Sequence, residues 1–279
     1  MRLTTVAPRK EIRKWIHHFW IFESERGLPA NDLRVVVPNG RPKLIVPFRN
    51  GLTASATSML QHHAQSDAVV IGLWEEPSII SSEETFTATI GVEFVPHGLS
   101  AFFPIEAHEI SGKVVSVEDY AGRLGTELKR RVGSAECIAD AVEIVQTFLL
   151  DRLNASTWTT QTIDAAVGLL SDGGYRMGVA ELERKMGYSR RYLHTLFLRH
   201  VGIPPKRLLG VVAFERLYRR FSQEKSAALL RTDALDLFYD QSHFIKTFRR
   251  FTGFSPGKFA ELDNEFGRIF YRPGPVRSA

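Results

Sequence analysis

Two segments of the chain repeat one arrangement of basic, aromatic and turn-forming residues. Residues 188–205 align without gaps on residues 239–256, at an offset of 51 residues. Both segments carry arginine and other polar side chains at helical spacing, and such groups bind phosphate oxygens and base edges in DNA. Both are therefore candidates for binding a polyanion. The matched pairs are Tyr188/Tyr239, Phe197/Phe248, Arg199/Arg250, Gly202/Gly253 and Pro205/Pro256.

Each copy has the parts of a capped amphipathic helix. Ser189 and Asp240 stand at the start as N-cap residues. Gly202 and Gly253 stand where a left-handed residue ends a helix. The apolar stripes are Leu193, Leu196 and Phe197 in the first copy and Phe244, Phe248 and Phe251 in the second.

The first copy is preceded by a short helical pattern over 179–185 and a tight turn at Met186-Gly187-Tyr188. A helix, a short turn and a capped second helix predict a helix-turn-helix. The second helix of this motif enters the major groove with its N-terminal residues against base edges. Two such units, joined by a predicted helix over 205–222, would read two segments about 34–36 Å apart.

The polar face of each copy supplies the candidate DNA-binding residues. In the first copy we expect base contacts from residues that follow the cap Ser189, namely Arg190, Arg191, His194 and Thr195. Phosphate anchors are expected at Arg199, Lys206, Arg249, Arg250 and Lys258. Gln241, Ser242 and Lys246 would read the second segment, whereas His243 either belongs to this face or packs under the turn. For each residue the alternatives are a phosphate contact or a solvated helix face.

The charge is distributed unevenly along the chain. The net charge is +5, from 36 Lys and Arg against 31 Asp and Glu. Residues 1–155 carry −3 and residues 156–279 carry +8. The basic half is the one that contains the repeat, which favours a polyanionic partner for that half alone.

Composition excludes several classes of protein. The 279 residues suit about two domains, and a single cysteine, Cys137, excludes an intrachain disulfide and a cysteine-rich zinc finger. No uncharged apolar run approaches the roughly 20 residues of a membrane span, and the N-terminus lacks the apolar core of a signal peptide. We expect a cytoplasmic protein with no membrane association.

The N-terminal half reads as short strands over 17–23, 33–38, 43–48, 68–73 and 86–95, separated by turn residues. This pattern predicts a small β-barrel or sandwich. Helices are predicted over 117–132 and 134–153, the second with Ser134 as its N-cap. The second helix either packs on its own domain or forms a dimer interface.

Enzyme functions find little support. His17-His18 and His62-His63 are adjacent pairs, whose side chains point to opposite faces of a strand. A metal-dependent cupin enzyme, the rival interpretation, is therefore disfavoured, and no metal or cofactor is expected. Cys137 on an apolar helix is poor support for a DNA-repair methyltransferase. The aromatic residues of this half either form the core or line a ligand pocket: Trp15, Phe19, Trp20, Phe48, Trp74 and Phe94. His97 is interpreted as a loop residue.

The repeat resembles the AraC/XylS family of transcriptional regulators. Residues 239–259, YDQSHFIKTFRRFTGFSPGKF, resemble the family's C-terminal signature, and residues 179–209 resemble its first helix-turn-helix. The resemblance covers roughly 157–265 and implies seven helices in two helix-turn-helix subdomains. In the second unit, Leu237 stands where the family usually has the turn glycine, and Asp233 stands where it usually has a small apolar residue. In the bridging helix, Ala213 and Leu217 replace the Arg and Ala that the family usually has. Base reading is therefore expected of the first unit, and left open for the second.

The N-terminal half is similar to the cupin-like sensor domain of one AraC-type subgroup, over 35–48 and 90–103. The fold class is then α+β, an N-terminal small cupin-like β-barrel plus helices and a C-terminal all-α domain with two helix-turn-helix units. The division expected is 1–115 sensor domain, 116–156 helical linker or dimerisation region, 157–265 DNA-binding domain and 266–279 C-terminal tail.

The resemblance implies a sequence-specific regulator, an activator because the family is mostly activators, whose N-terminal domain senses a small molecule. Its partners would be double-stranded DNA, a second copy of the chain and RNA polymerase. The alternative is a regulator that a protein partner controls through the N-terminal domain.

Overall fold

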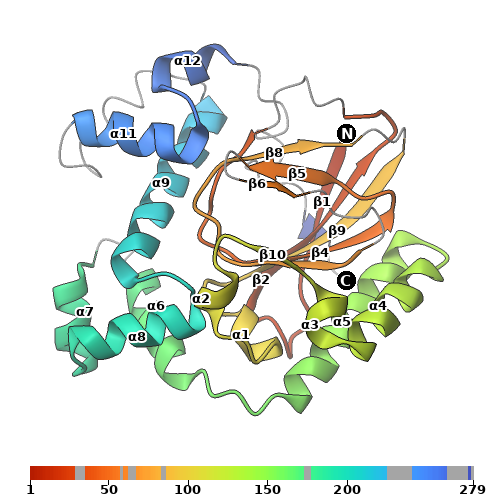
Figure 1. The fold of residues 1–279 in the computed structure, drawn as a ribbon, viewed down its shortest axis with the longest axis horizontal. Helices are drawn as coiled ribbons and strands as arrows, with labels where there is room; N and C mark the ends of the chain where they lie inside the picture. The colour runs from red at the N-terminus through yellow and green to blue at the C-terminus, as the bar shows by residue number, and fades with distance from the viewer. Residues whose placement is uncertain are drawn as a thin grey trace.

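The computed structural model describes residues 1–28, 35–56, 59–61, 67–82, 86–172, 177–224, 241–262 and 276–277. Strands fill the N-terminal part and helices the C-terminal part, which lies along one side of the strands (Figure 1). The α+β fold class is confirmed at this level.

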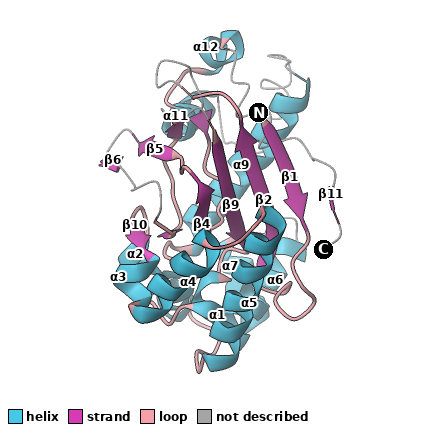
Figure 2. Ribbon diagram, turned by 90° about the vertical axis from the view of Figure 1, so that its right-hand side faces the viewer, coloured by secondary structure: helices cyan, strands magenta, loops and turns pink. Residues whose placement is uncertain are grey.

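The larger sheet has seven strands in the order β10-β7-β4-β9-β2-β1-β11. Its neighbours pair antiparallel except β1 and β11, which are parallel. The central strand β9 is buried along its whole length, including the polar side chains of Thr87, Thr89 and Glu93. The long strands lie side by side in Figure 2. The bounds are β1 Arg2–Val6, β2 Ile16–Ser24, β4 Lys43–Arg49, β7 Val69–Ile71, β9 Thr87–Phe94, β10 Val114–Ser116 and β11 Val276–Arg277.

The smaller sheet has four strands in the order β3-β8-β5-β6. They are β3 Val35–Val36, β5 Thr53–Ala56, β6 Met59–Gln61 and β8 Ser78–Ser81. In neither sheet do the end strands pair with each other within the described ranges, so these strands form two open sheets and not the closed barrel that the pattern of short strands predicted. Strand spacing alone does not encode closure, which depends on pairing between the first and last strands.

Five helices follow β9 in the N-terminal part: α1 Leu99–Phe102, α2 Ala107–Ile110, α3 Val117–Ala121, α4 Arg123–Gly133 and α5 Ile138–Ala155. The helix predicted over 117–132 is broken at Gly122 into α3 and α4. Ser134 ends α4 as its C-cap, and Cys137 is the N-cap of α5, so the prediction of Ser134 as an N-cap was wrong.

The apolar stripe of α5 is buried within its own domain. Val145 and Leu149 are fully buried and belong to one cluster with Phe94 and Phe102. This contact favours the packed interpretation of the helix, because the stripe is not available to a second copy of the chain.

The C-terminal part contains α6 Gln161–Asp172, α7 Val179–Met186, α8 Arg190–His200, α9 Pro205–Glu224, α11 Gln241–Thr252 and α12 Pro256–Glu261. The long helix α9 matches the bridging helix predicted over 205–222 and runs between α6–α8 and α11–α12 (Figure 1). The seventh helix that the resemblance implies would fall within 225–240. These residues, which include Asp233, Leu237 and Asp240, lie outside the part of the chain that the structure describes.

The two parts of the chain share apolar packing. Val35, Val37 and Leu73 are 1% exposed and belong to the same core cluster as Leu208, Val211 and Phe214 of α9. Residues of the N-terminal part therefore complete the core of the helical part, and burial of this apolar surface opposes separation of the two.

The C-terminal segment returns to the N-terminal sheet. Val276 and Arg277 pair with Thr5 and Val6 of β1 as a short parallel strand. The segment was expected only as a C-terminal tail, because this strand pairing is a long-range contact that local composition does not reveal. None of the described helices is both long and apolar enough to cross a membrane.

Candidate nucleic-acid interface

The first helix-turn-helix is formed by α7 and α8. Gly187 ends α7 with φ 71°, a left-handed conformation that glycine adopts without a steric penalty. Ser189 then caps α8, as predicted, because its Oγ accepts a hydrogen bond from the backbone N–H of Tyr192 at 3.3 Å. The turn and cap fix the direction in which α8 leaves α7.

The structure places the predicted residues of α8 on its exposed side. Arg190, Arg191, His194, Thr195 and Arg199 are all exposed, while Leu193 and Phe197 are buried. Arg190 donates from Nε and Nη2 to Glu183 of α7, at 3.0 and 3.2 Å. The Thr195 hydroxyl donates to the carbonyl of Arg191 at 3.1 Å. The guanidinium of Arg190 is therefore already engaged within the motif.

The same division holds for α11 in the second unit. Phe244, Phe248 and Phe251 are buried, as the stripe predicted. His243 is exposed, so it does not pack beneath the turn. The other candidates on this helix are likewise exposed, as are those near the start of α9 and α12: Gln241, Ser242, Lys246, Arg249, Arg250, Lys206 and Lys258.

Two arginines that are equivalent in the repeat pair with glutamates of the N-terminal part. Arg199 Nε lies 3.0 Å from Oε1 of Glu106, and its guanidinium lies 4.6 Å from the ring centre of Trp158. Arg250 Nη2 donates to Oε1 of Glu75 at 2.8 Å. The C-terminal ends of α8 and α11 are thus each paired with an acidic residue that sequence spacing could not connect to them.

Glu75 also accepts hydrogen bonds from Arg207 in the first turn of α9. The Arg207 Nε lies 3.1 Å from Oε1 of Glu75, and its Nη2 donates to Oε2. The side chain of Glu75 is only 10% exposed. One nearly buried carboxylate therefore binds two guanidinium groups from two different helices.

His97 lies at the boundary between the two parts. Its Nε2 is 2.7 Å from Oδ1 of Asp164 in α6, and Lys14 Nζ is 2.5 Å from Oδ2. Burial favours a raised pKa for Asp164, but hydrogen bonds from His97 and Lys14 lower it below its ordinary value. His97 is 6% exposed, so its interpretation as a loop residue missed a buried contact.

A second buried histidine, His200, is the last residue of α8. Its Nδ1 accepts a hydrogen bond from Nε1 of Trp158 at 3.1 Å and lies 3.2 Å from Oγ of Ser100 in α1. Burial, followed by the charges of Arg199 and His97, lowers the pKa of His200 to about 4. The ring is neutral near pH 7 and can act as this acceptor.

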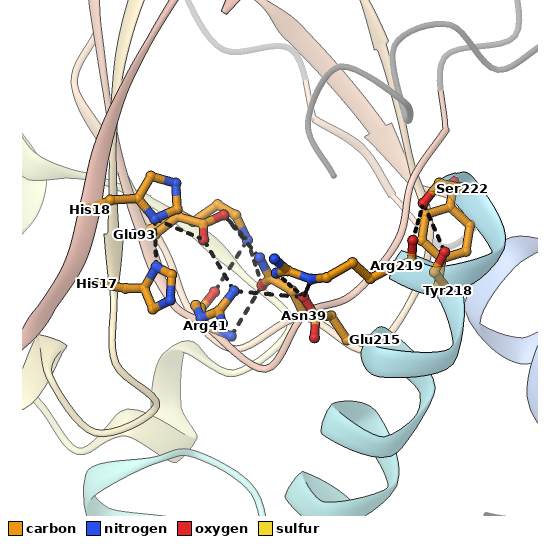
Figure 3. Close-up of polar contacts among 10 residues, drawn as sticks. His17, His18, Asn39, Arg41, Glu93, Glu215, Tyr218, Arg219 and Ser222 are labelled. Carbon is orange, nitrogen blue, oxygen red and sulfur yellow. Dashed lines mark hydrogen bonds and ion pairs between the residues drawn. The ribbon is translucent and has the colours of Figure 1, made fainter. Parts of the chain in front are cut away.

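Glu93 of β9 is the centre of a buried ion-pair network (Figure 3). Asn39 Nδ2 donates to its Oε1 at 2.9 Å, Arg41 Nη1 lies 3.5 Å from Oε2 and Lys43 Nζ 3.9 Å from Oε1. Burial alone would raise the pKa of Glu93, but Lys43 and Arg41 hold it at about 2. Arg41 Nη1 is also 3.9 Å from Oε1 of Glu215 in α9, so the network extends to the bridging helix.

His17 and His18 do not point to opposite faces of β2. A register irregularity between Ile16 and His18 in the β2–β9 pairing turns both rings to one side, and their Nδ1 atoms are 2.5 Å apart. The rings and Glu93 gather their possible ligand atoms within 4.8 Å. The expectation of opposed side chains was wrong because alternation holds only in a regular strand.

This cluster nevertheless suits a metal ion poorly. Arg41 and Lys43 already supply positive charge to Glu93, and a divalent cation would be repelled by both. Burial lowers the pKa of His17 to about 4 and also lowers that of His18. The arrangement is that of neutral imidazoles beside an ion pair. His62 and His63 lie outside the described residues.

A cavity of about 330 Å³ lies between the two parts of the chain. The aromatic residues that were candidates for a ligand pocket do not line this cavity. Phe19 and Phe94 are fully buried in the N-terminal core, and Phe48 lines a separate hollow with Val132. Its polar lining comes from both parts, namely Lys14, His17, Arg41 and His97 from one and Asp164 and Glu215 from the other.

Two family models match separate segments of the chain. Residues 182–261 match the model of a helix-turn-helix domain, and residues 4–116 match a domain of unknown function, DUF6597. The chain is 26% identical over 119 residues to the raffinose operon transcriptional regulatory protein RafR of Pediococcus pentosaceus. That match covers 42% of this chain and 42% of that protein.

Among solved structures, ToxT from Vibrio cholerae is similar with a TM-score of 0.47 and 10% identity, covering 87% of this chain and 98% of that one. The AraC-like transcriptional activator CuxR gives a TM-score of 0.28 and 15% identity, covering 69% of this chain and 77% of that one. The chain therefore contains a helix-turn-helix domain of the AraC type, together with an N-terminal domain of unknown function.

Proposed function

We propose that the protein is a sequence-specific DNA-binding transcriptional regulator that uses two helix-turn-helix units. The observation that carries this proposal is the repeated geometry of α8 and α11. Each helix buries an aromatic or aliphatic stripe and exposes a polar, basic face near its N-terminus. The net charge of +8 in residues 156–279 supports a polyanionic partner for this half.

In this proposal Arg191, His194 and Thr195 read base edges, together with Arg190 once its guanidinium leaves Glu183. Gln241, Ser242 and Lys246 face the second segment. Arg199, Lys206, Arg249, Arg250 and Lys258 anchor phosphates, which fix the register of the protein on the duplex without reading sequence.

The N-terminal part, for which a cupin-like fold remains a prediction, senses a small molecule and changes the freedom of the helix-turn-helix units. The cavity between the parts supports this role, because Arg41 and His97 line it from one side and Asp164 and Glu215 from the other. An occupant would contact both parts at once. Activation, a homodimer and contact with RNA polymerase belong to the same proposal, as does a cytoplasmic location.

Selection of genomic DNA fragments with the purified full chain tests the DNA-binding function. We expect recovered sites to share one motif, with two conserved blocks about 10–10.5 base pairs apart from centre to centre. Recovery of fragments with no common motif would contradict sequence-specific binding.

A thermal-shift screen of metabolites with the full chain tests the sensing role. A ligand of the cavity raises Tm in a dose-dependent way. Gly168 lines the cavity in α6, and a side chain added there meets nothing within 4 Å. Gly168→Leu should therefore abolish the shift by filling the cavity, whereas Gly210→Leu, on α9 and away from the cavity lining, should keep it.

A regulator controlled by a protein partner is the second candidate. It would show no Tm shift with any metabolite, and its DNA affinity would change only when a partner protein is added.

A further inference from the structure

The shared carboxylate of Glu75 brings Arg207 and Arg250 to a single point. Arg207 is in the first turn of α9 and Arg250 in the last turn of α11, so they belong to the bridging helix and the second recognition helix. Both guanidiniums donate to the same carboxylate. A phosphodiester oxyanion presents the same kind of paired acceptor oxygens to arginine as a carboxylate does.

We propose that Arg207 and Arg250 together form one binding site for a DNA backbone phosphate, and that Glu75 occupies this site while the two parts of the chain are docked. The proposal rests on the DNA-binding function proposed above and adds Arg207, which lies outside both recognition helices, to the interface. It also gives the N-terminal part a direct means of competing with DNA.

The first unit shows the same arrangement at the equivalent position. Arg199 aligns on Arg250 in the repeat, and its partner Glu106 likewise belongs to the N-terminal part. The adjoining glycines are also equivalent, and both face that part: a Cβ on Gly202 would lie 2.8 Å from the carbonyl oxygen of Ala107, and one on Gly253 would lie 3.8 Å from Pro77. The N-terminal part therefore contacts the same end of both recognition helices.

The ion pairs with Glu106 and Glu75 lie at the phosphate-binding end of each helix. The residues at the other end, among them Arg191 and His194 on α8 and Gln241 and Ser242 on α11, are exposed in the docked arrangement. Docking thus leaves the base-reading residues uncovered and occupies the arginines that supply nonspecific, salt-dependent affinity. We infer that release of Glu75 raises affinity for DNA of any sequence.

Glu75→Gln in the full chain tests the proposal. The amide keeps the size of the side chain and removes its charge, so the fold is retained. Binding to a duplex of mixed sequence should tighten by about tenfold, the scale of one charge-assisted hydrogen bond. The slope of log K against log salt concentration should steepen by about 0.9 for each arginine that gains a phosphate, and so by up to about 1.8. Glu136→Gln, which removes the same charge from the exposed α4–α5 connection, should change neither quantity.

A second pair of variants separates phosphate binding from mere loosening of the two parts. In the Glu75→Gln background, Arg207→Ala and Arg250→Ala should each return the salt slope toward the wild-type value, and each should cost more affinity than in the wild-type background. Equal behaviour of Glu75→Gln and Glu136→Gln, or no effect of Arg207→Ala in the Glu75→Gln background, would overturn the proposal while wild-type DNA binding stands. Absence of DNA binding by every variant and by the wild type would overturn the proposed function and this inference with it.

Discussion

Nε2 of His97 lies 2.7 Å from Oδ1 of Asp164, and this pair joins the segment after β9 to the first helix of the C-terminal part. Lys14 adds a second contact to the same carboxylate. The docking of the two parts therefore depends on a polar group that can be titrated, in addition to the apolar residues that they share.

Asp164→Asn should weaken the docked arrangement and remove part of the acid sensitivity of the protein. The pKa of Asp164 is lowered in the folded chain, so its contribution to stability is present above the unfolded value of 3.8 and is lost as pH falls through the folded value. Loss of charged hydrogen bonds should cost about 1.5–3 kcal/mol near pH 7. Chemical unfolding at a series of pH values checks this, and Asp172→Asn at the exposed end of α6 should match the wild type.

His200→Gln should flatten the pH dependence of stability between about pH 6.5 and 4. The unfolded chain binds a proton at His200 in this window and the folded chain does not, so the free energy of unfolding of the wild type falls as pH falls from 6.5 toward 4. The difference between the unfolded pKa of 6.5 and the folded pKa of about 4 corresponds to a loss of at most about 3 kcal/mol in the free energy of unfolding. A glutamine Oε1 can still accept the Trp158 N–H.

If the free energy of unfolding fell equally for His200→Gln and the wild type between pH 6.5 and 4, His200 would not be the source of the pH dependence. His17, whose pKa is also lowered to about 4, provides the comparison. His17→Gln should remove a separate share of the same dependence.

Gly202→Ala should destabilise the chain, while Gly210→Ala should stabilise it. Gly202 has φ 92° and its added Cβ would stand 2.8 Å from the backbone of α2, so both strain and a clash result. Gly210 lies in α9 with nothing within 4 Å, where alanine should gain about 0.5–1 kcal/mol. Thermal unfolding of the two variants should move Tm in opposite directions, and a lowered Tm for both would contradict the open position of Gly210.

His194→Ala should relax base preference at one position of the selected operator. Loss of a base contact costs about 1–3 kcal/mol on the preferred sequence and little on others, because only the preferred base makes it. Arg250→Ala in the Glu75→Gln background, where the guanidinium is free to bind a phosphate, should instead weaken binding to all sequences and reduce the salt slope. Binding titrations against the operator and single-base variants measure both, and equal losses on every sequence for the two variants would contradict these roles.

The repeat was predictable because its elements are local. The Ser189 cap, the Gly187 turn and the stripe that includes Phe197 each follow from neighbouring residues, and the structure contains all three. The strands β2, β4 and β9 were likewise predictable, since each is a run of β-branched or aromatic residues.

The contacts between the two parts were not predictable from spacing. Glu75 and Arg250 are 175 residues apart, and Ser100 and His200 are 100 apart. Nothing in the local pattern around Glu75 distinguishes it from its neighbour Glu76. The shared side of His17 and His18 was missed for a different reason, because a bulge reverses the alternation that a sequence pattern assumes.

The apolar packing that Val35, Val37 and Leu73 contribute to the helical core limits how the two halves of this chain can be recombined with those of other proteins. A chimera that joins its C-terminal helices to the N-terminal half of another protein would lack these three side chains and expose apolar residues of the cluster to which they belong. The two halves must therefore be transplanted together, or the recipient must supply apolar residues of matching size at the same three places.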